Sequence, residues 1–421
     1  MPFGPISDLS IHLKNSSKKQ AAVSFTKETA ACNSYDLLRY TWQMTTSIIN
    51  SNTIIIGAGP AGLAVGACLK QAGIQSILLE TNDKVGSTWR RHYDRLHLHT
   101  DKKNSELPFM PFPKEYPRYP SRDHVIEYLE CYAKKFSLDI RFNQQVKRAQ
   151  QENNLWEVET KDARYSAPNL VVATGYAREP FIPEWKGKDT FNGKVIHSSE
   201  YKNGMQFKGQ SVLVVGFGNS GGEIAIDLFE HGAKPGIAVR NAVNVIPREL
   251  AGIPILSIGI VQNIMPAWMA DLVNMPILRA VIGDITQYGL RKLPYGPATQ
   301  IKNDKHIPLI DVGTIKLIKQ GHVAVFQGVA EFTENSIKFT DGKEAQFDAV
   351  ILATGYRPRV NDFLQAASST FDKEGTPTFT GKKTSIPGLY FCGYYVSPTG
   401  MLREIAMEAK QISAEISKIK Q

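Results

Sequence analysis

The sequence predicts an α/β fold with two domains, each built on a parallel sheet and one inserted within the other. Three observations support this prediction. Two separate segments show the order strand, glycine-rich turn, helix and strand, and each is followed downstream by a short apolar strand that ends in the letters ATG. The chain has 421 residues, which is enough for two domains that each bury a core.

The first of these segments is TIIIGAGPAGLAVGACLKQAGIQSILLE, residues 53–80. Its GxGxxG turn is typical of dinucleotide binding: Gly57 permits the tight turn, Gly59 lets a pyrophosphate approach the backbone, and Gly62 lets the helix pack closely on the strand. The helix N-terminus then faces the anion, and Glu80 is placed to accept hydrogen bonds from ribose hydroxyls. The residues expected to bind the cofactor here are Gly57, Gly59, Pro60, Ala61, Gly62 and Glu80.

The second segment, SVLVVGFGNSGGEIAIDLFEHGAKPGIAVR at residues 211–240, repeats this logic with one change. Its last strand ends in Arg240 where the first segment ends in Glu80. A guanidinium can hold the 2′-phosphate of NADP, which an acid would repel; the alternative is a solvated surface arginine. One acid-ended and one arginine-ended site together suggest a flavin and NADPH held face to face. The expected binding residues are Gly216, Gly218, Asn219, Ser220, Gly221 and Arg240.

The two ATG strands set the expected domain boundaries. LVVATGY at 170–176 follows the first fingerprint, and VILATGY at 350–356 follows the second. We therefore expect two Rossmann-like dinucleotide-binding domains, with the NADPH domain inserted within the FAD domain. The FAD domain is assigned to residues 44–185 and 310–421, and the NADPH domain to residues 186–309.

Two segments do not fit a regular sheet. LPFMPFPKEYPRYP, residues 107–120, carries five prolines and is expected to form an ordered lid because of its aromatic residues. Residues 250–285 are strongly apolar but are interrupted by Pro254, Pro266 and Pro276, so they cannot form one spanning helix. Short helices over a cavity are favoured for this segment. The alternative is a surface patch in peripheral contact with a membrane.

Composition excludes some functions. The formal charge of +9 suits anionic ligands or surfaces, but no long run of like charge and no basic–aromatic platform occurs, so nucleic acid is not expected. The four cysteines form no CxxC pair, which favours a reducing, cytoplasmic setting. His97 and His99 would share one face of a strand, but with no third ligand in view no metal site is expected.

The first 43 residues contain no apolar core of the length a signal peptide or membrane span needs. We interpret residues 1–43 as a dispensable N-terminal tail or an over-long start, and a weak transit peptide stays open. From Met44 onward the sequence has a few polar residues followed by a predicted buried strand, which is typical of the start of a folded chain.

A motif between the two fingerprints carries a family resemblance. FNGKVIHSSEY, residues 191–201, matches FxGxxxHxxxY through Phe191, Gly193, His197 and Tyr201. In this position the pattern resembles the identifying motif of class B flavin monooxygenases. The segment looks like a linker and hinge between the nucleotide domains, and His197 reads equally well as a hydrogen-bonded structural residue.

Further segments resemble the plant YUCCA branch of that family, whose members convert indole-3-pyruvate to indole-3-acetate: GSTWR (86–90), LHLHTDKKNSELPFMPFP (96–113), VRNAVNVIPRE (239–249), YGLRKLPYGP (288–297) and IPLIDVGT (307–314). The resemblance implies FAD at the first fingerprint, NADPH at the second and Trp89 near the flavin. It also places His99 where many members have an asparagine beside the reacting flavin, so His99 is the candidate catalytic residue. A strand histidine satisfied by the backbone is the alternative.

The resemblance implies a mechanism in which NADPH reduces the flavin, O2 adds at the C4a carbon, and the peroxide is protected from water until it meets a small-molecule substrate. The leading hypothesis is oxidative decarboxylation of an aromatic 2-oxo acid such as indole-3-pyruvate. N- or S-oxygenation of amines and sulfides and a non-catalytic membrane-associated flavoprotein stay open, as does homo-oligomerisation. A disulfide reductase would need a cysteine pair near the flavin, which the sequence lacks.

Overall fold

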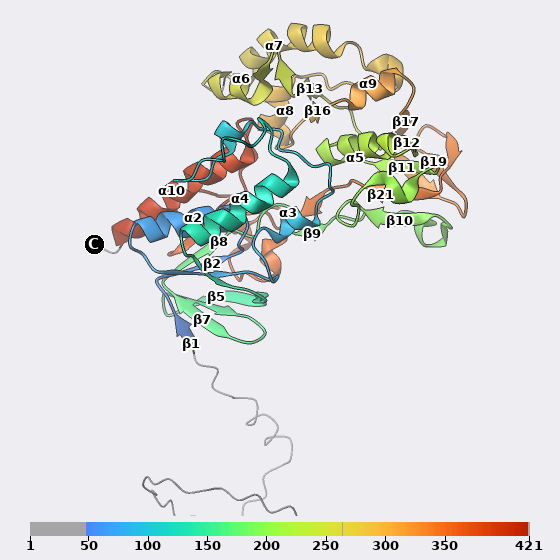
Figure 1. Ribbon diagram of the computed structural model, residues 1–421. Coiled ribbons are helices and arrows are strands. Elements are labelled where there is room, and N and C mark those ends of the chain that lie inside the picture. Colours follow the sequence, from blue (N-terminus) through green and yellow to red (C-terminus); the bar gives the residue numbers. More distant parts are fainter. Residues whose placement is uncertain (1–47, 263, 420–421) are drawn as a thin grey trace, which may run out of the picture. The chain divides into compact units, whose positions relative to one another are not determined.

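The computed structural model describes residues 48–262 and 264–419 (Figure 1). The expected tail, residues 1–43, lies outside the described residues. None of the described helices is both long and apolar enough to cross a membrane.

The first fingerprint lies in a five-stranded parallel sheet, as predicted. The sequence run 53–80 forms strand β2, helix α2 and strand β3, and the strand before the first ATG pairs directly with β2. In spatial order the strands are β23 (Leu389–Phe391), β8 (Asn169–Val172), β2 (Thr53–Ile56), β3 (Ser76–Leu79) and β4 (Asp139–Arg141).

The two faces of this sheet bury different cores because side chains alternate along a strand. Ile55, Leu78 and Val171 face a helical layer, while Ile54 and Leu79 face a small second sheet. The helices are α2 (Pro60–Gln71), α10 (Met401–Ile419), α4 (Arg122–Lys135) and the short α3 (Ser87–Arg91). The second sheet is β1 (Ile48–Asn50), β7 (Arg164–Ala167), β6 (Leu155–Glu159) and β5 (Arg148–Glu152).

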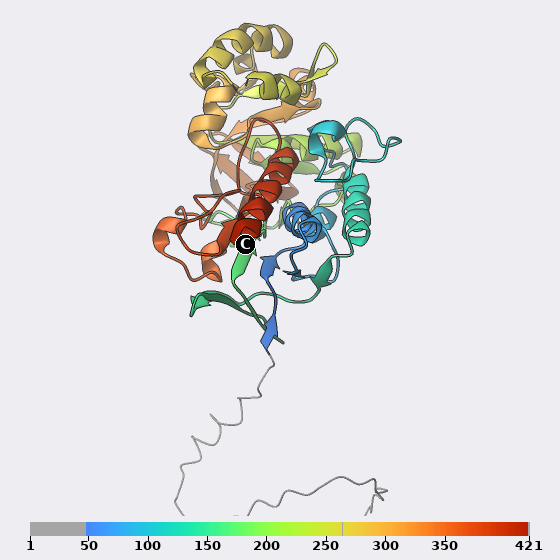
Figure 2. The ribbon, with the colours of Figure 1, turned by 90° about the vertical axis from the view of Figure 1, so that its left-hand side faces the viewer.

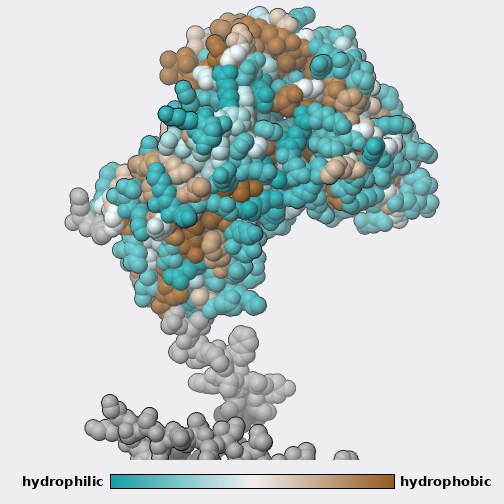
Figure 3. Space-filling view, in the orientation of Figure 1, coloured by the Kyte–Doolittle hydropathy of each residue, from teal (hydrophilic) through white to brown (hydrophobic). Residues whose placement is uncertain are grey.

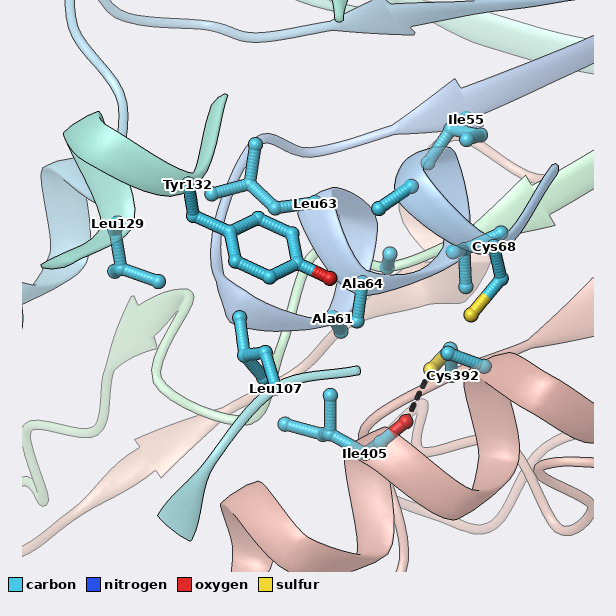
Figure 4. Close-up of a cluster of buried hydrophobic side chains, with 14 of the residues drawn as sticks. Ile55, Ala61, Leu63, Ala64, Cys68, Leu107, Leu129, Tyr132, Cys392 and Ile405 are labelled. Atoms are coloured by element: carbon cyan, nitrogen blue, oxygen red, sulfur yellow. Dashed lines mark hydrogen bonds between the residues drawn. The ribbon is translucent and has the colours of Figure 1, made fainter. Parts of the chain in front are cut away.

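Helices α2 and α10 lie side by side in both views (Figures 1 and 2). Figure 4 shows their packing, in which Ala61, Ala64 and Cys68 of α2 face Ile405 of α10. Small residues on α2 let the two helices approach closely. This packing holds α2 in place, and with it the N-terminus that directly follows the glycine-rich turn.

The second fingerprint lies in a second five-stranded parallel sheet of the same plan. One face packs on α5 (Asn219–Glu230) and α9 (Thr314–Lys319), and the other on an antiparallel sheet. The parallel strands are β10 (Lys194–His197), β21 (Ala349–Leu352), β11 (Ser211–Val215), β12 (Lys234–Val239) and β17 (Ala324–Gln327). The antiparallel strands are β18 (Val329–Phe332), β19 (Ser336–Phe339) and β20 (Glu344–Gln346).

The two connections between the domains run next to each other. Strand β9 (Glu179–Pro180) leaves the first domain and pairs antiparallel with β22 (Tyr356–Arg357), on which the chain returns. The expected insertion of one domain within the other therefore agrees with the path of the chain. The expected return at residue 310 is wrong, because β21 (349–352) pairs with β11 and so belongs to the second sheet.

The apolar segment 250–285 forms short helices, as expected, in a region that Figure 1 shows above the second sheet. It is joined to the second domain by a parallel pair of strands. The elements of this region are β13 (Val245–Pro247), β14 (Glu249–Leu250), β15 (Ile253–Pro254), α6 (Ile255–Gln262), α7 (Ala267–Ile282), α8 (Pro297–Asp304) and β16 (Leu309–Asp311).

The proline-rich segment 107–120 is ordered but packs along α4. The Phe112 ring stacks on Tyr128 with centroids 3.9 Å apart, and the Tyr128 hydroxyl donates to the carbonyl of Met110 at 2.6 Å. The hydroxyl of Tyr132 donates to the carbonyl of Pro108 at 2.8 Å. The aromatic residues therefore fix the segment to a helix, and the expectation of a lid is not supported by these contacts.

The motif at 191–201 has a structural role in the second domain. Tyr201 is fully buried, and its hydroxyl donates to Asp227 of α5 at 2.5 Å. His197 accepts the backbone N–H of Ser199 at Nδ1 (3.1 Å), so Nε2 donates to the carbonyl of Gly355 (3.1 Å), the glycine of the second ATG. Burial lowers the pKa of His197. Both ring nitrogens are used, which supports the structural interpretation of this histidine.

The end of α3 is tied to the second domain by Lys202 and to helix α4 of its own domain by Arg122. The Lys202 ammonium donates to the carbonyls of Arg90 and Arg91 at 2.9 and 3.0 Å, and Arg122 donates to the carbonyl of His92 at 3.0 Å. Burial lowers the pKa of His92 to about 4, and the positive charges of Arg91, Lys202 and Arg122 lower it further in the same direction. The ring is therefore held neutral within the fold.

This predicts an acid-sensitive contribution to stability. An unfolded histidine has a pKa near 6.5, so below that pH the unfolded chain binds a proton at His92 while the folded protein does not. Proton binding therefore stabilises the unfolded state. The contribution of neutral His92 to the free energy of unfolding is complete above about pH 6.5. It is lost as the pH falls towards 4, by about 3 kcal/mol at most. Urea unfolding at stepped pH should show a shallower loss in His92→Phe than in the unchanged protein. Parallel curves over this window would contradict the assignment.

Candidate functional site

A cavity of about 720 Å³ lies where the two domains meet. Its wall contains residues of the first fingerprint, of the segment 86–100, and of the start of helix α5 in the second domain. Among the residues singled out from the sequence, those that line it are Gly57, Gly59, Pro60, Ala61, Glu80, Trp89, His99, Asn219 and Ser220. Those that do not are Gly62, Gly216, Gly218, Gly221 and Arg240.

In the first fingerprint the outer two glycines are required by packing. Gly57 has φ +106°, and a side chain there would stand 2.6 Å from the carbonyl oxygen of Ala173, the alanine of the first ATG. A side chain at Gly62 would overlap the carbonyl of Gly57. These positions set the turn and the approach of helix to strand, as their spacing predicts.

The second fingerprint repeats the same contacts. Gly216 has φ +118°, and a side chain there would overlap the carbonyl of Ala353, the alanine of the second ATG. A side chain at Gly221 would overlap the carbonyl of Gly216. The repeated ATG thus has a physical reason: its alanine carbonyl lies against the first glycine of each turn.

The middle glycines differ from their neighbours because nothing fills the space beside them. No atom lies within 4 Å of a side chain built at Gly59 or at Gly218. Each is the N-cap of its helix, and no side chain caps either N-terminus. Uncapped N–H groups at the start of a helix attract anions, so these open positions fit the pyrophosphate of a dinucleotide.

Glu80 is buried at the end of β3 and faces the glycine turn. Its Oε2 accepts the backbone N–H of Ala58 at 2.9 Å, and its Oε1 accepts the backbone and side-chain N–H of Asn82 at 3.0 and 2.9 Å. The carboxylate therefore holds the turn in place, and it retains acceptor capacity for a ribose hydroxyl.

The arginine-ended strand lies outside the cavity. Arg240 is exposed and follows the last residue of β12, the place where the fingerprint predicts a 2′-phosphate contact. The guanidinium of Arg291 donates to the carbonyl of Arg240 and brings a second exposed arginine to this strand end. Arg291 was not singled out from the sequence, because it reaches this place from a loop 51 residues further along the chain.

His99 lines the cavity and forms a contact between the domains. Its Nε2 donates to the carboxylate of Glu223, a buried residue of α5. This contact occupies one of the two ring nitrogens of His99 and leaves Nδ1 without a partner in this contact. Glu223 was missed from the sequence, although an acid within an apolar stretch of the fingerprint helix was a signal.

The expected strand that would carry His97 and His99 on one face is absent. His97 forms an isolated bridge to Ser121 and is exposed, with Nδ1 2.6 Å from the carbonyl of Arg95. Among the described residues no group of three or more His, Cys, Asp or Glu side chains is arranged to hold a metal.

A second recess of about 500 Å³ adjoins the cavity, and His97 and His99 line both. Three arginines, Arg95, Arg118 and Arg248, contribute to its wall together with Glu223. The Arg248 guanidinium lies over the ring of Tyr119, 4.3 Å from its centroid. Arg95 and Arg118 are paired with Glu230 and Glu249, so Arg248 is the arginine of this wall for which no acidic partner is seen among the described residues.

Comparison with known proteins identifies relatives over most of the chain. Residues 54–247 match the family described as pyridine nucleotide-disulphide oxidoreductase. The chain is 43% identical over 363 residues to probable indole-3-pyruvate monooxygenase YUCCA4 of Arabidopsis thaliana, covering 83% of this chain and 86% of that protein. It is 43% identical over 349 residues to indole-3-pyruvate monooxygenase YUCCA1 of Oryza sativa subsp. japonica, covering 81% and 86%.

Solved structures share the fold. A flavin-containing monooxygenase from Stenotrophomonas maltophilia superposes with a TM-score of 0.69 at 21% identity, covering 89% of this chain and all of that one. A bacillithiol disulfide reductase from Staphylococcus aureus gives 0.64 at 19% identity, with the same coverage. The two-domain α/β fold predicted from the sequence is thereby confirmed. With relatives 43% identical over more than four fifths of its length, the protein is an enzyme that belongs to the YUCCA family of monooxygenases.

Proposed function

We propose that the protein is an NADPH- and FAD-dependent monooxygenase that oxidatively decarboxylates an aromatic 2-oxo acid such as indole-3-pyruvate. The observation that carries the proposal is the cavity of about 720 Å³ that brings the first fingerprint and the start of α5 to one space. The YUCCA relatives, which are named for indole-3-pyruvate, support the substrate.

FAD fits the first fingerprint. The pyrophosphate would occupy the open space beside Gly59 at the uncapped start of α2, and Glu80 would accept from the ribose. Trp89 lines the same cavity from α3 and supplies an aromatic surface. Bound there, FAD would supply the redox chemistry that NADPH and O2 require of the enzyme.

NADPH fits the second fingerprint. Its pyrophosphate would lie beside Gly218 at the uncapped start of α5, where Asn219 and Ser220 line the cavity. The Asn219 side chain accepts the backbone N–H of Ile310 at 2.9 Å, which holds that turn against β16. Arg240 and Arg291 would bind the 2′-phosphate at the end of β12.

The protein's own residues position the substrate and exclude water. Apolar side chains enter the cavity from several elements, including Leu256 at the start of α6, Ile307, Ile310 and Met401. They suit an aromatic ring and a dry reaction space. His99 is held against Glu223 at the cavity wall, so the imidazole keeps one orientation. We propose that this pair fixes the boundary between the flavin and nicotinamide sides.

A disulfide reductase, whose fold is similar, would need a thiolate at the cavity. Burial raises the pKa of Cys68 to about 12 and raises that of Cys392 well above its ordinary value. Figure 4 shows both thiols in the core between α2 and α10, and no described cysteine lines the cavity. This favours the monooxygenase. The described cysteines, Cys68, Cys131 and Cys392, are all free, which supports a reducing, cytoplasmic location.

The substrate is tested by offering four compounds side by side to the purified enzyme with NADPH and O2. We expect arylacetate products from indole-3-pyruvate and phenylpyruvate, and little oxidation of trimethylamine or thioanisole. The apolar wall suits all the aromatic compounds, so the group that would favour the acids is Arg248 of the adjoining recess. Efficient formation of N- or S-oxides without arylacetate would reject the decarboxylase and retain the monooxygenase.

The two open glycines provide a matched pair for the cofactor sites. Gly59→Val should fold but lack FAD, because the new side chain fills the space of the pyrophosphate and its Cβ meets no protein atom within 4 Å. Gly218→Val should keep its FAD and lose reduction by NADPH. The FAD absorbance of each purified variant and its rate of reduction check this. A flavin-saturated Gly59→Val protein would contradict the site, whereas Gly57→Val is unsuitable because it clashes with Ala173.

Arg240 should determine preference for NADPH. A charged hydrogen bond contributes about 1.5–3 kcal/mol, so Arg240→Ala should raise the KM for NADPH roughly ten- to a hundredfold and leave that for NADH nearly unchanged. Lys234→Ala is the matched control, because Lys234 is an exposed cation at the opposite end of β12. Steady-state kinetics with both nucleotides measure the effect. Equal losses with NADPH and NADH would show that Arg240 is structural.

A further inference from the structure

Helix α7 presents a largely apolar face to the outside. Its exposed positions recur in pairs every fourth residue, which places them on one side of a helix. Trp268 is 63% exposed, Leu272 71% and Val273 57%. The residues of this face are Trp268, Met269, Leu272, Val273, Pro276, Ile277, Ala280 and Val281. A surface helix in water normally carries polar side chains at such positions.

The apolar surface continues beyond α7. Val261 at the end of α6 is 69% exposed, Ile264 in the connection is 91% exposed, and Ile253 in the preceding hairpin is 53% exposed. We call these three residues together with the outer face of α7 the α6–α7 face. Figure 3 shows a broad hydrophobic patch over these helices. A continuous patch of this kind marks an interaction surface.

The polar side chains of the two helices are turned inward and satisfied within the protein. Gln262 and Asn274 exchange hydrogen bonds through their amide groups, at 3.0 and 2.7 Å. Asp271 is buried and accepts the backbone N–H groups of Ala298 and Thr299 at the start of α8. Among the residues of the outer face, the exposed hydrogen-bonding groups are the indole N–H of Trp268 and, at the edge, the guanidinium of Arg279.

We propose that the α6–α7 face binds the surface of a lipid bilayer, with both helices lying in the plane of the interface. Hydrocarbon is the environment in which internally satisfied polar groups and an unbroken apolar face carry no penalty. Trp268 in the first turn of α7 and Arg279 in its last turn are residue types that anchor at the boundary between lipid and water.

Charge near the face favours anionic lipid. The loops and helix that follow α7 expose three basic residues, Lys292, Lys302 and Lys305, against the exposed acids Asp284 and Asp304. Helix α8, which carries Lys302, packs directly on α7. The whole chain carries a formal charge of +9. Basic residues beside an apolar surface are attracted to acidic headgroups, so charge and apolar area act together.

A second copy of the chain is the competing occupant. Protein interfaces carry about one hydrogen bond per 100–200 Å² and place polar groups at the rim and within the patch. The α6–α7 face offers almost none, because its amides and its acid are used internally. The bilayer is therefore the better match, and the dimer becomes an outcome of the test. The proposal does not depend on the reaction that the enzyme catalyses.

The test is flotation of the full chain with vesicles of neutral phosphatidylcholine and with vesicles that also contain phosphatidylserine. We expect binding to both, stronger on the anionic vesicles and weakened there by salt. Vesicles should also shield Trp268 from iodide quenching, measured as the difference between the unchanged protein and Trp268→Phe. If the protein floats with neither kind of vesicle, the proposal is overturned.

The decisive variant is Trp268→Ser/Leu272→Gln/Val273→Gln, whose side chains are exposed and are not part of the cofactor or substrate site. The bound fraction should fall at least about tenfold, because apolar area drives interfacial binding. Its matched control replaces three exposed apolar residues elsewhere, Leu155→Gln/Met205→Gln/Phe379→Ser, and should bind as the unchanged protein does.

Light scattering distinguishes the remaining outcome. A dimer that the triple variant dissociates, without vesicle binding by the unchanged protein, would assign the face to a second copy and reject the bilayer. Equal vesicle binding by the triple variant and the unchanged protein would also reject it. Flavin content and turnover of a soluble substrate should be the same in all three proteins, which shows that the variants fold.

Discussion

Both nucleotide sites depend on one short-range constraint, the close approach of the first fingerprint glycine to a carbonyl of the neighbouring strand. Gly57 lies against Ala173, and Gly216 lies against Ala353. The approach requires a residue without a side chain at positive φ. It sets where the helix begins, and so where its free N–H groups point. The middle glycine can then stay open to a ligand because its neighbours carry the packing.

The second requirement is that the two nucleotide sites be held in a fixed position relative to each other. Several contacts join the two domains near the cavity. The Lys202 ammonium donates to the end of α3, Tyr93 packs in the core of the second domain, and His99 contacts Glu223. The acids at Glu223 and Asp227 lie one turn apart on α5, and each receives a hydrogen bond from outside the helix. Helix α5, the helix proposed to bind NADPH, is therefore also a place where the domains meet.

Most of the fold could be predicted from the sequence because it rests on local patterns. Strand periodicity, glycine spacing and the acid or arginine at a strand end are all recognised within about 30 residues, and Glu80 and Arg240 were proposed as binding residues in this way. What the sequence could not supply depends on distant segments. The return point at residue 310 was placed too early, and Arg291 came from a remote loop.

Orientation was equally hidden from the sequence. Apolar residues at 250–285 predict helices, but composition is the same whether an apolar face turns towards a cavity or outward. The structure shows both: Leu256 enters the cavity, while Leu272 and its neighbours point away. The polar residues decide the matter, because Asn274 and Asp271 find their partners inside the protein. Those partners become visible only when the fold is known.

The pairing of β9 with β22 has a consequence for how such enzymes diversify. The second domain starts beside Pro180 and ends beside Tyr356, so its two ends are neighbours in space. A unit whose ends meet can be cut out and replaced without stretching the host. The nucleotide preference and the α6–α7 face are both carried between those two points, so a single exchange between relatives would transfer them together and leave the flavin-binding half intact.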